Sequence, residues 1–251
     1  MTENPFSLAG KTILVTGASS GIGKRTAIES ARLGADVIIS ARNLERLEET
    51  RLAIAEFGKE AVVIPAELTS AEDVESLVSS VPDLDGVVLC SGKGLTLPVQ
   101  FASRDKFDEM FSINFFSPVE LLRLLYKKKK IKKEGSVVVI ASLGGTSVYS
   151  GGNSIYGASK AALNSFMKFC AKEFAARKIR VNTICPAMVE TPLIHRGTVS
   201  DEQLQEDMKR YPLKRYGQPE DIAYGAVYRL SDASCWVTGH SLVIDGGLSL
   251  Q

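Results

Sequence analysis

The sequence predicts an α/β fold, a doubly wound parallel sheet of about seven strands with helices on both faces. Two observations carry this prediction. Short apolar runs alternate along the chain with longer amphipathic segments, which is typical of a parallel sheet whose strands are connected by helices. The runs are rich in β-branched residues and apolar at successive positions, as expected of strands that are buried on both faces.

The apolar runs give the expected strands and the amphipathic segments give the expected helices. The strands are Thr12–Val15, Val37–Ile39, Val62–Ile64, Val87–Leu89, Val137–Ile140, Ile179–Ile184 and Leu242–Ile244. The helices lie near residues 22–33, 43–57, 71–80, 103–126, 155–177 and 219–230. Two of them have start signals, because Ser70 precedes a pair of acidic residues and Pro219 opens a segment that begins with acids.

A single domain over residues 1–251 is expected, because no linker divides the chain. The segment 190–215 is the least regular and comes late enough to cover the carboxyl edge of the sheet. We therefore expect it to form a substrate lid, although Leu193 and Ile194 could instead anchor this segment to the body. Its larger side chains suit a moderately apolar ligand. They are Pro192, Leu193, Ile194, His195, Met208 and Tyr211.

Composition argues against several classes of function. The net charge is +1, so no overall field would recruit nucleic acid or a membrane surface. No apolar run approaches the roughly 18 residues of a membrane span, and the N-terminal residues show no secretory pattern. The cysteines are scattered and only two histidines exist, which argues against a disulfide scaffold or a metal site and indicates a cytoplasmic setting. These residues are Cys90, Cys170, Cys185, Cys235, His195 and His240.

A glycine-rich turn joins the first expected strand to the first expected helix, as in Rossmann-type nucleotide-binding folds. Its spacing is GxxxGxG over Gly17–Gly23. Glycines at this point permit a tight turn and let backbone N–H groups approach a pyrophosphate at the helix N-terminus. Many glycine-rich turns bind nothing, but the position between strand and helix favours a nucleotide. The candidate residues are Gly17, Ser19, Ser20, Gly21, Ile22 and Gly23.

The end of the second strand predicts NADP rather than NAD. An enzyme that binds NAD typically has an acidic residue near this point to hold the ribose 2′-hydroxyl. Here the chain has Ala41 followed by Arg42. A guanidinium can hold a 2′-phosphate through two parallel hydrogen bonds. The alternative is that Arg42 is a solvated residue at a strand end.

Tyr156 and Lys160 are the candidate acid/base pair. They lie four residues apart, so on a helix they share one face. A free phenol titrates near pH ~10, and a neighbouring ammonium favours the phenolate and lowers that pKa. Such a tyrosine can protonate a carbonyl oxygen as hydride arrives at the carbon. The pattern alone also occurs in ordinary surface pairs.

Several motifs in order resemble the short-chain dehydrogenase/reductase family over essentially the whole chain. The motifs are Thr16–Gly23, Leu89–Gly92, Asn114, Ser142, Tyr156 with Lys160, Pro186, Thr191 and Val243–Gly247. The resemblance implies that Tyr156 is the general acid and base, that Lys160 tunes it and holds the nicotinamide ribose, and that Ser142 bonds the substrate oxygen. It also implies that Asn114 anchors a proton-relaying water.

The same resemblance implies further cofactor contacts and two alternatives to the assigned roles. Ser142 could merely cap a loop, and Asn114 could be a buried amide satisfied by the backbone. The additional cofactor-binding residues are Glu67, Leu68, Ser91, Gly92, Pro186, Val189 and Thr191.

The chain departs from the family pattern at four points. The usual Asn-Asn-Ala-Gly is Leu89–Gly92, the usual Asp after the third strand is Glu67, and the usual Gly after Pro186 is Ala187. Ser142 and Tyr156 lie 14 positions apart, which lengthens the intervening loop by one residue. None of these changes removes a reactive group.

The substrate is less well defined than the reaction. The resemblance to 3-oxoacyl-(acyl-carrier-protein) reductases favours a 3-oxoacyl thioester, with the same chemistry on a sugar, a steroid or another secondary alcohol as the alternative. A catalytically silent NADP-binding sensor or scaffold is a third hypothesis.

Partners are suggested by two further features. Six lysines lie within Lys127–Lys133. They are either a solvated helix end or, with Arg177, a docking site for an anionic partner such as acyl carrier protein. The family also implies a homotetramer built on the helices near 103–126 and 155–177.

Overall fold

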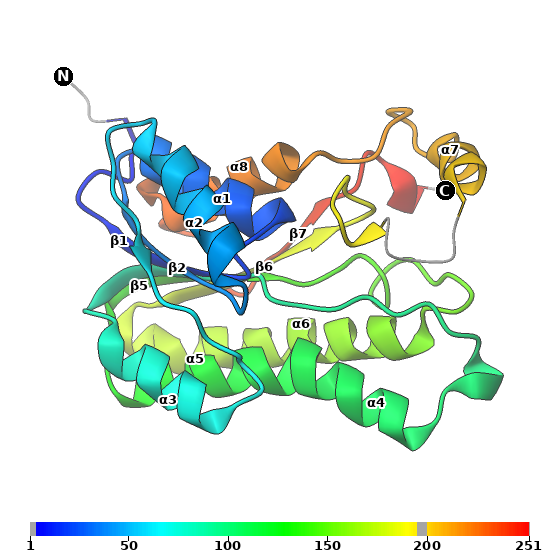
Figure 1. Cartoon of the computed structure of the whole chain (residues 1–251), viewed down its shortest axis with the longest axis horizontal. Coiled ribbons are helices and arrows are strands. Elements are labelled where there is room, and N and C mark those ends of the chain that lie inside the picture. Colours follow the sequence, from blue (N-terminus) through cyan, green and yellow to red (C-terminus); the bar gives the residue numbers. More distant parts are fainter. Residues whose placement is uncertain (1–3, 195–199, 251) are drawn as a thin grey trace.

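The computed structural model describes residues 4–194 and 200–250. Seven parallel strands form one sheet in the order β3-β2-β1-β4-β5-β6-β7. This confirms the predicted doubly wound, Rossmann-type sheet with helices on both faces (Figure 1). The strands are β1 Thr12–Thr16, β2 Asp36–Ser40, β3 Val62–Val63, β4 Leu84–Leu89, β5 Ile131–Ile140, β6 Arg180–Pro186 and β7 Ser241–Ile244.

Two layers of helices enclose the sheet. The α-helices are α1 Gly21–Arg32, α2 Leu44–Ala55, α3 Ala71–Ser80, α4 Arg104–Phe111, α5 Ser117–Lys127, α6 Ser154–Phe174, α7 Asp201–Met208 and α8 Pro219–Leu230. Helices α1, α2 and α8 cover one face, and α3, α4, α5 and α6 cover the other (Figure 1). Successive residues of β1 point to opposite layers, since Ile13 packs with the first group and Leu14 with the second. Burial on both faces therefore explains the continuous apolar runs.

Two strands differ from their predicted extents. β5 begins at Ile131, six residues before the predicted Val137, because the lysine-containing stretch is irregular strand with Glu134 at φ 68°. β3 has only two residues, and Val62 is 57% exposed. It lies at the edge of the sheet, where the expectation of burial on both faces is wrong.

The predicted helix near 103–126 is interrupted by a π-helical turn, η2, over Ser112–Phe116. The Ser117 hydroxyl donates to the Ser112 carbonyl at 2.7 Å, and Pro118 follows in the first turn of α5. Because proline has no N–H, Pro118 cannot donate to the Asn114 carbonyl four residues back. The wider turn places the Asn114 side chain inside the protein, with no exposed surface.

The predicted lid at 190–215 contains a helix that was not expected. Ser200 and Gln203 form a capping box at the start of α7. This segment packs on the body through an apolar cluster that includes Tyr211, Leu143 and Leu248. Residues 195–199 of the lid, including His195, lie outside the described residues, as do residues 1–3 and 251 of the expected domain.

Within the described ranges, no helix has the length and apolar character needed to cross a membrane.

Candidate active site

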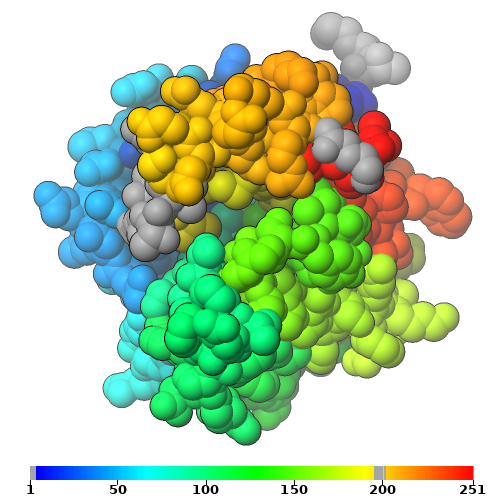
Figure 2. Space-filling model, turned by 90° about the vertical axis from the view of Figure 1, so that its right-hand side faces the viewer, coloured from blue at the N-terminus to red at the C-terminus, as the bar shows by residue number. Residues whose placement is uncertain are grey.

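The predicted site residues gather at the carboxyl edge of the sheet. This edge carries the ends of β1, β4, β5 and β6 and the beginnings of α1 and α6. Figure 2 looks onto it, with the lid in yellow and orange on one side and the segments after β4 and β5 in green on the other. A crevice at the strand ends is where open α/β sheets bind their ligands.

The glycine turn has no room for a side chain at Gly17 or Gly23. Gly17 has φ +66°, and a Cβ there would lie 2.9 Å from the Ser91 backbone nitrogen. A Cβ on Gly23 would lie 2.3 Å from the Gly17 carbonyl oxygen. The turn therefore packs against both β4 and α1 and leaves the N-terminus of α1 uncovered by its N-cap residue Ser20, whose side chain makes no capping bond. This cradle fits a pyrophosphate.

The end of β4 continues the cradle towards the candidate catalytic residues. Thr16 Oγ1 accepts from the Cys90 N–H at 3.2 Å and so holds β4 against β1. A Cβ on Gly92 would lie 3.2 Å from both Asn114 Oδ1 and Lys160 Nζ. Gly92 thus lies close against these two side chains, at the point where the predicted contact of Ser91 and Gly92 with the cofactor would be made.

Arg42 and Glu67, which were predicted to contact different parts of the cofactor, contact each other. Arg42 Nη1 donates to Glu67 Oε2 at 3.2 Å. The Ala66 N–H donates to the Ala41 carbonyl at 3.1 Å and brings the chain after β3 beside the end of β2. Leu68 is 9% exposed and belongs to the core beneath. The Arg42–Glu67 contact forms because β2 and β3 are neighbours in the sheet, so no local sequence pattern predicts it.

Ser142, Tyr156 and Lys160 come together as predicted. Ser142 follows β5, and the other two lie on the first turns of α6. The Ser142 hydroxyl faces the Tyr156 phenol and, as a hydrogen-bond donor, lowers its pKa. It also accepts from the Gly144 N–H at 3.0 Å, so the loop-capping alternative holds at the same time. Lys160 is only 4% exposed, and its Nζ donates to the Ile140 carbonyl at 3.0 Å.

The direction of the Tyr156 pKa differs from the prediction. Burial raises the pKa of Tyr156 above its ordinary value, and the bond from Ser142 offsets this only in part. The Lys160 ammonium is directed to the Ile140 carbonyl, so it does not bring the phenol pKa down in the protein alone. Burial also lowers the pKa of Lys160 to about 8.

The Asn114 side chain is fully used within the protein. Oδ1 accepts from the Lys93 N–H at 2.8 Å, and Nδ2 donates to the Lys93 carbonyl at 2.9 Å and to Ser159 Oγ at 3.2 Å. The alternative of an amide satisfied by the backbone thus describes this side chain. The side chain therefore holds the chain after β4 beside α6.

The chain after β6 forms the remaining side of the crevice. The Leu143 N–H donates to the Pro186 carbonyl at 2.9 Å, and Val189 is buried. Thr191 reaches the glycine turn, since its methyl lies 3.0 Å from a Cβ built on Gly21. The predicted residues Pro186, Val189 and Thr191 therefore lie on a segment that runs from the chain after β5 to the glycine turn.

Several residues shape the site without having been predicted. Lys93 is fixed at its backbone by Asn114, and its ammonium forms an ion pair with Glu109 of α4. The Leu97 N–H donates to the Gly152 carbonyl at 2.7 Å, which joins the segments after β4 and β5. Gly145, at φ +83°, would place a Cβ 2.2 Å from the Gly157 carbonyl. Glycine at position 145 was the only available sequence signal, since the other contacts are long-range.

Among residues 4–194 and 200–250, no group of three or more His, Cys, Asp or Glu residues could hold a metal ion. The group available for proton transfer at this edge is the half-buried phenol of Tyr156.

Comparisons with known proteins agree with this architecture. A family model described as enoyl-(acyl carrier protein) reductase matches residues 17–249. A 3-oxoacyl-[acyl-carrier-protein] reductase of Rickettsia bellii is 34% identical over 97% of this chain and 98% of its own length. A tropinone reductase homolog of Arabidopsis thaliana is 32% identical over 98% of this chain and 92% of its own length.

Solved structures give the same result. A protein of Beutenbergia cavernae, provisionally described as an NAD(P)-dependent gluconate 5-dehydrogenase and containing NADP at low occupancy, has a TM-score of 0.90 at 31% identity. The match covers 99% of this chain and 100% of that one. A short-chain type dehydrogenase/reductase from Mycobacterium marinum has a TM-score of 0.92 at 28% identity, with 98% of each chain covered.

Proposed function

The chain belongs to the short-chain dehydrogenase/reductase family of oxidoreductases, and we propose that it uses NADP to interconvert a carbonyl compound and a secondary alcohol. Arg42 at the end of β2 supports NADP, because no acidic residue follows this strand directly. The glycine turn would hold the pyrophosphate, Arg42 the 2′-phosphate and Lys160 the nicotinamide ribose. When bound, the cofactor supplies or accepts the hydride.

The arrangement of Ser142, Tyr156 and Lys160 carries this proposal. In reduction, the Tyr156 hydroxyl donates its proton to the carbonyl oxygen while Ser142 donates a hydrogen bond to the same oxygen. The raised pKa of Tyr156 keeps the phenol protonated at neutral pH, which suits a proton donor. With the cofactor bound, the ammonium of Lys160 would stabilise the phenolate that remains.

Replacing Tyr156 by Phe tests the assignment. Tyr156→Phe removes the proton donor and leaves the ring, so turnover should fall by about 10²–10⁴-fold, as expected for loss of a general acid. The measurement is the loss of NADPH absorbance with a panel of ketones, aldehydes and β-keto thioesters. Full activity of Tyr156→Phe would show that the mechanism is wrong.

A 3-oxoacyl thioester is the first substrate to test, since relatives at 34% identity are reductases of that kind. Lys132 is paired with Asp85 at 2.8 Å, and Arg177 donates to the Ile131 carbonyl at 2.7 Å. Both groups lie where β5 begins, at the edge opposite Tyr156. We therefore place a free thioester ahead of one bound to acyl carrier protein.

The same panel of substrates distinguishes this function from two alternatives. Turnover of a sugar or steroid alcohol without turnover of acetoacetyl thioesters would favour the second substrate class. Binding of NADPH without turnover of any substrate would favour a silent sensor, although the complete set of Ser142, Tyr156 and Lys160 argues against that function.

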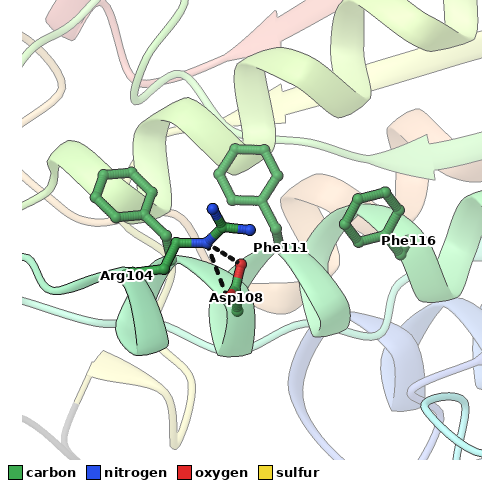
Figure 3. Close-up of a pocket in the computed structure, with 5 residues that line it drawn as sticks. Arg104, Asp108, Phe111 and Phe116 are labelled. Atoms are coloured by element: carbon green, nitrogen blue, oxygen red, sulfur yellow. Dashed lines mark hydrogen bonds and ion pairs between the residues drawn. The ribbon is translucent and has the colours of Figure 1, made fainter.

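We further propose that the chain assembles as a homotetramer through α4, η2 and α6. Phe116 and Phe169 are 59% and 65% exposed. The rings of Phe115 and Phe166 pack edge to face, with their centroids 5.8 Å apart. Figure 3 shows Phe111 and Phe116 along a shallow pocket of about 360 Å³ beside the Arg104–Asp108 ion pair. An apolar surface of this kind favours a protein partner.

A further inference from the structure

Arg42 and Glu67 form an ion pair at the edge of the nucleotide crevice. The distance from Arg42 Nη1 to Glu67 Oε2 is 3.2 Å, and the two side chains are 74% and 38% exposed. The guanidinium thus faces solvent beside the ends of β2 and β3, with a carboxylate already bound to one of its N–H groups.

We propose that Glu67 is a specificity-determining residue that opposes binding of the cofactor's 2′-phosphate at Arg42. The inference rests on the proposed function, in which Arg42 takes that phosphate. It assigns to Glu67 an effect on the choice between NADP and NAD, beyond the contact with adenine that was predicted for this position.

The carboxylate of Glu67 is held by its own loop. Oε1 accepts from the Thr69 N–H at 3.1 Å, and the Glu67 N–H donates to Asp73 Oδ2 at 2.8 Å. Asp73 is in turn fixed by Ser70, the N-cap of α3. Because these bonds do not involve Arg42, we expect them to hold the Glu67 carboxylate in place when a ligand binds the guanidinium.

The Arg42–Glu67 contact leaves Arg42 able to bind phosphate but adds repulsion. A guanidinium has five N–H donors and Glu67 engages one of them, so a phosphate can still bind. The phosphate then shares the guanidinium with a carboxylate that carries charge of the same sign. In a site this exposed, the repulsion should reduce affinity for the 2′-phosphate by roughly three- to tenfold. A 2′-hydroxyl meets no such penalty, since a carboxylate can accept its proton in a hydrogen bond.

Binding of two nucleotide fragments tests this directly. Isothermal titration calorimetry on the whole chain would give Kd for 2′,5′-ADP and for 5′-AMP, which differ only in the 2′-phosphate. The ratio of Kd for 5′-AMP to Kd for 2′,5′-ADP should rise roughly three- to tenfold in Glu67→Gln. Because 5′-AMP contains the adenine, a changed adenine contact cancels in this ratio.

Glu60→Gln is the matched control. It makes the same change in net charge, but Glu60 is 88% exposed and lies near Arg51 instead. The control should leave the ratio as in the wild type. An unchanged ratio in Glu67→Gln would overturn the inference, and a lower ratio would show that Glu67 positions Arg42 instead of opposing the phosphate.

The outcomes for the proposed function are separate. A wild-type preference for 2′,5′-ADP that is lost in Arg42→Gln supports the role of Arg42 whatever Glu67→Gln does. Equal Kd values for both fragments in the wild type and in Glu67→Gln would contradict the phosphate-binding role of Arg42 and this inference together.

Discussion

Lys160 combines a catalytic position with an unfavourable environment. Its side chain is almost fully buried, and burial lowers its pKa from 10.5 to about 8. Between these values the unfolded chain holds more protons than the folded one, so stability rises with pH over that interval. At neutral pH the fold therefore carries the full cost of burying the ammonium.

Lys160→Met should therefore stabilise the fold at pH 7 while reducing activity. The pKa shift corresponds to about 3 kcal/mol, from which loss of the bond to the Ile140 carbonyl subtracts about 1 kcal/mol. We expect a gain of roughly 1–2 kcal/mol in the free energy of unfolding by urea, and a smaller gain above pH 10. Lys168→Met, at an exposed position of the same helix, is the control. A less stable Lys160→Met would show that the buried ammonium is compensated by interactions that the geometry does not reveal.

The residues of the catalytic group could be predicted, but their interactions could not. Tyr156 and Lys160 have a helical spacing, and the ordered motifs of the family resemblance added Ser142 to them. The pKa of Tyr156 depends instead on how deeply the ring is buried, which is set by the whole fold. The Arg42–Glu67 pair joins positions 25 residues apart through two neighbouring strands.

The junction between α8 and β7 should give the protein a response to acid. Arg229 near the end of α8 is 3% exposed, and its Nη2 lies 2.8 Å from His240 Nδ1, just before β7. Since the guanidinium can only donate, Nδ1 must be unprotonated. The pKa of His240 is lowered by partial desolvation of its ring and then by the charges of Arg229 and Lys168. Protonation therefore removes a hydrogen bond and adds repulsion.

Lower pH should consequently weaken this junction. A lowered pKa in the folded state means that the stabilising effect of neutral His240 is present above the unfolded pKa of 6.5 and is lost as the pH falls through the folded value. Tm measured from pH 8 to pH 5 should fall less steeply in His240→Gln, because glutamine can still accept from Arg229 without titrating. If Tm falls with pH equally steeply in the wild type and in His240→Gln, this role of His240 is contradicted.

At the scale of elements, regular segments were predictable and irregular ones were not. Buried strands and amphipathic helices show in the apolar pattern, but the π-turn at Ser112–Phe116 has no period of its own. The π-turn is explained by Pro118 in the next turn, which has no N–H to donate. This effect can be predicted from the sequence only when a helix is already expected on both sides of Pro118. The capping box of Ser200 and Gln203 was a readable signal for α7, which the prediction of an irregular lid overlooked.

At the scale of the whole molecule, different surfaces carry different features. One edge of the sheet holds the glycine turn and the catalytic group, and the opposite edge carries the lysines between Lys127 and Lys133. Several of these are engaged within the chain, as Lys128 is with Glu75 and Lys132 with Asp85. The layer formed by α4, α5 and α6 instead exposes phenylalanines, so it is the face best suited to another copy of the chain.

Phe116→Glu with Phe169→Glu should separate the proposed tetramer without unfolding its chains. Both rings are more than half exposed, so their replacement removes little core packing, whereas charges facing one another across an interface repel. Sedimentation velocity should show an assembly of four 27.1 kDa chains for the wild type and a smaller species for the double variant. Leu52→Glu, at a 58% exposed position on α2 in the other layer, should leave the assembly intact. A double variant that sediments like the wild type would place the contact between subunits elsewhere, and a monomeric wild type would contradict the tetramer itself.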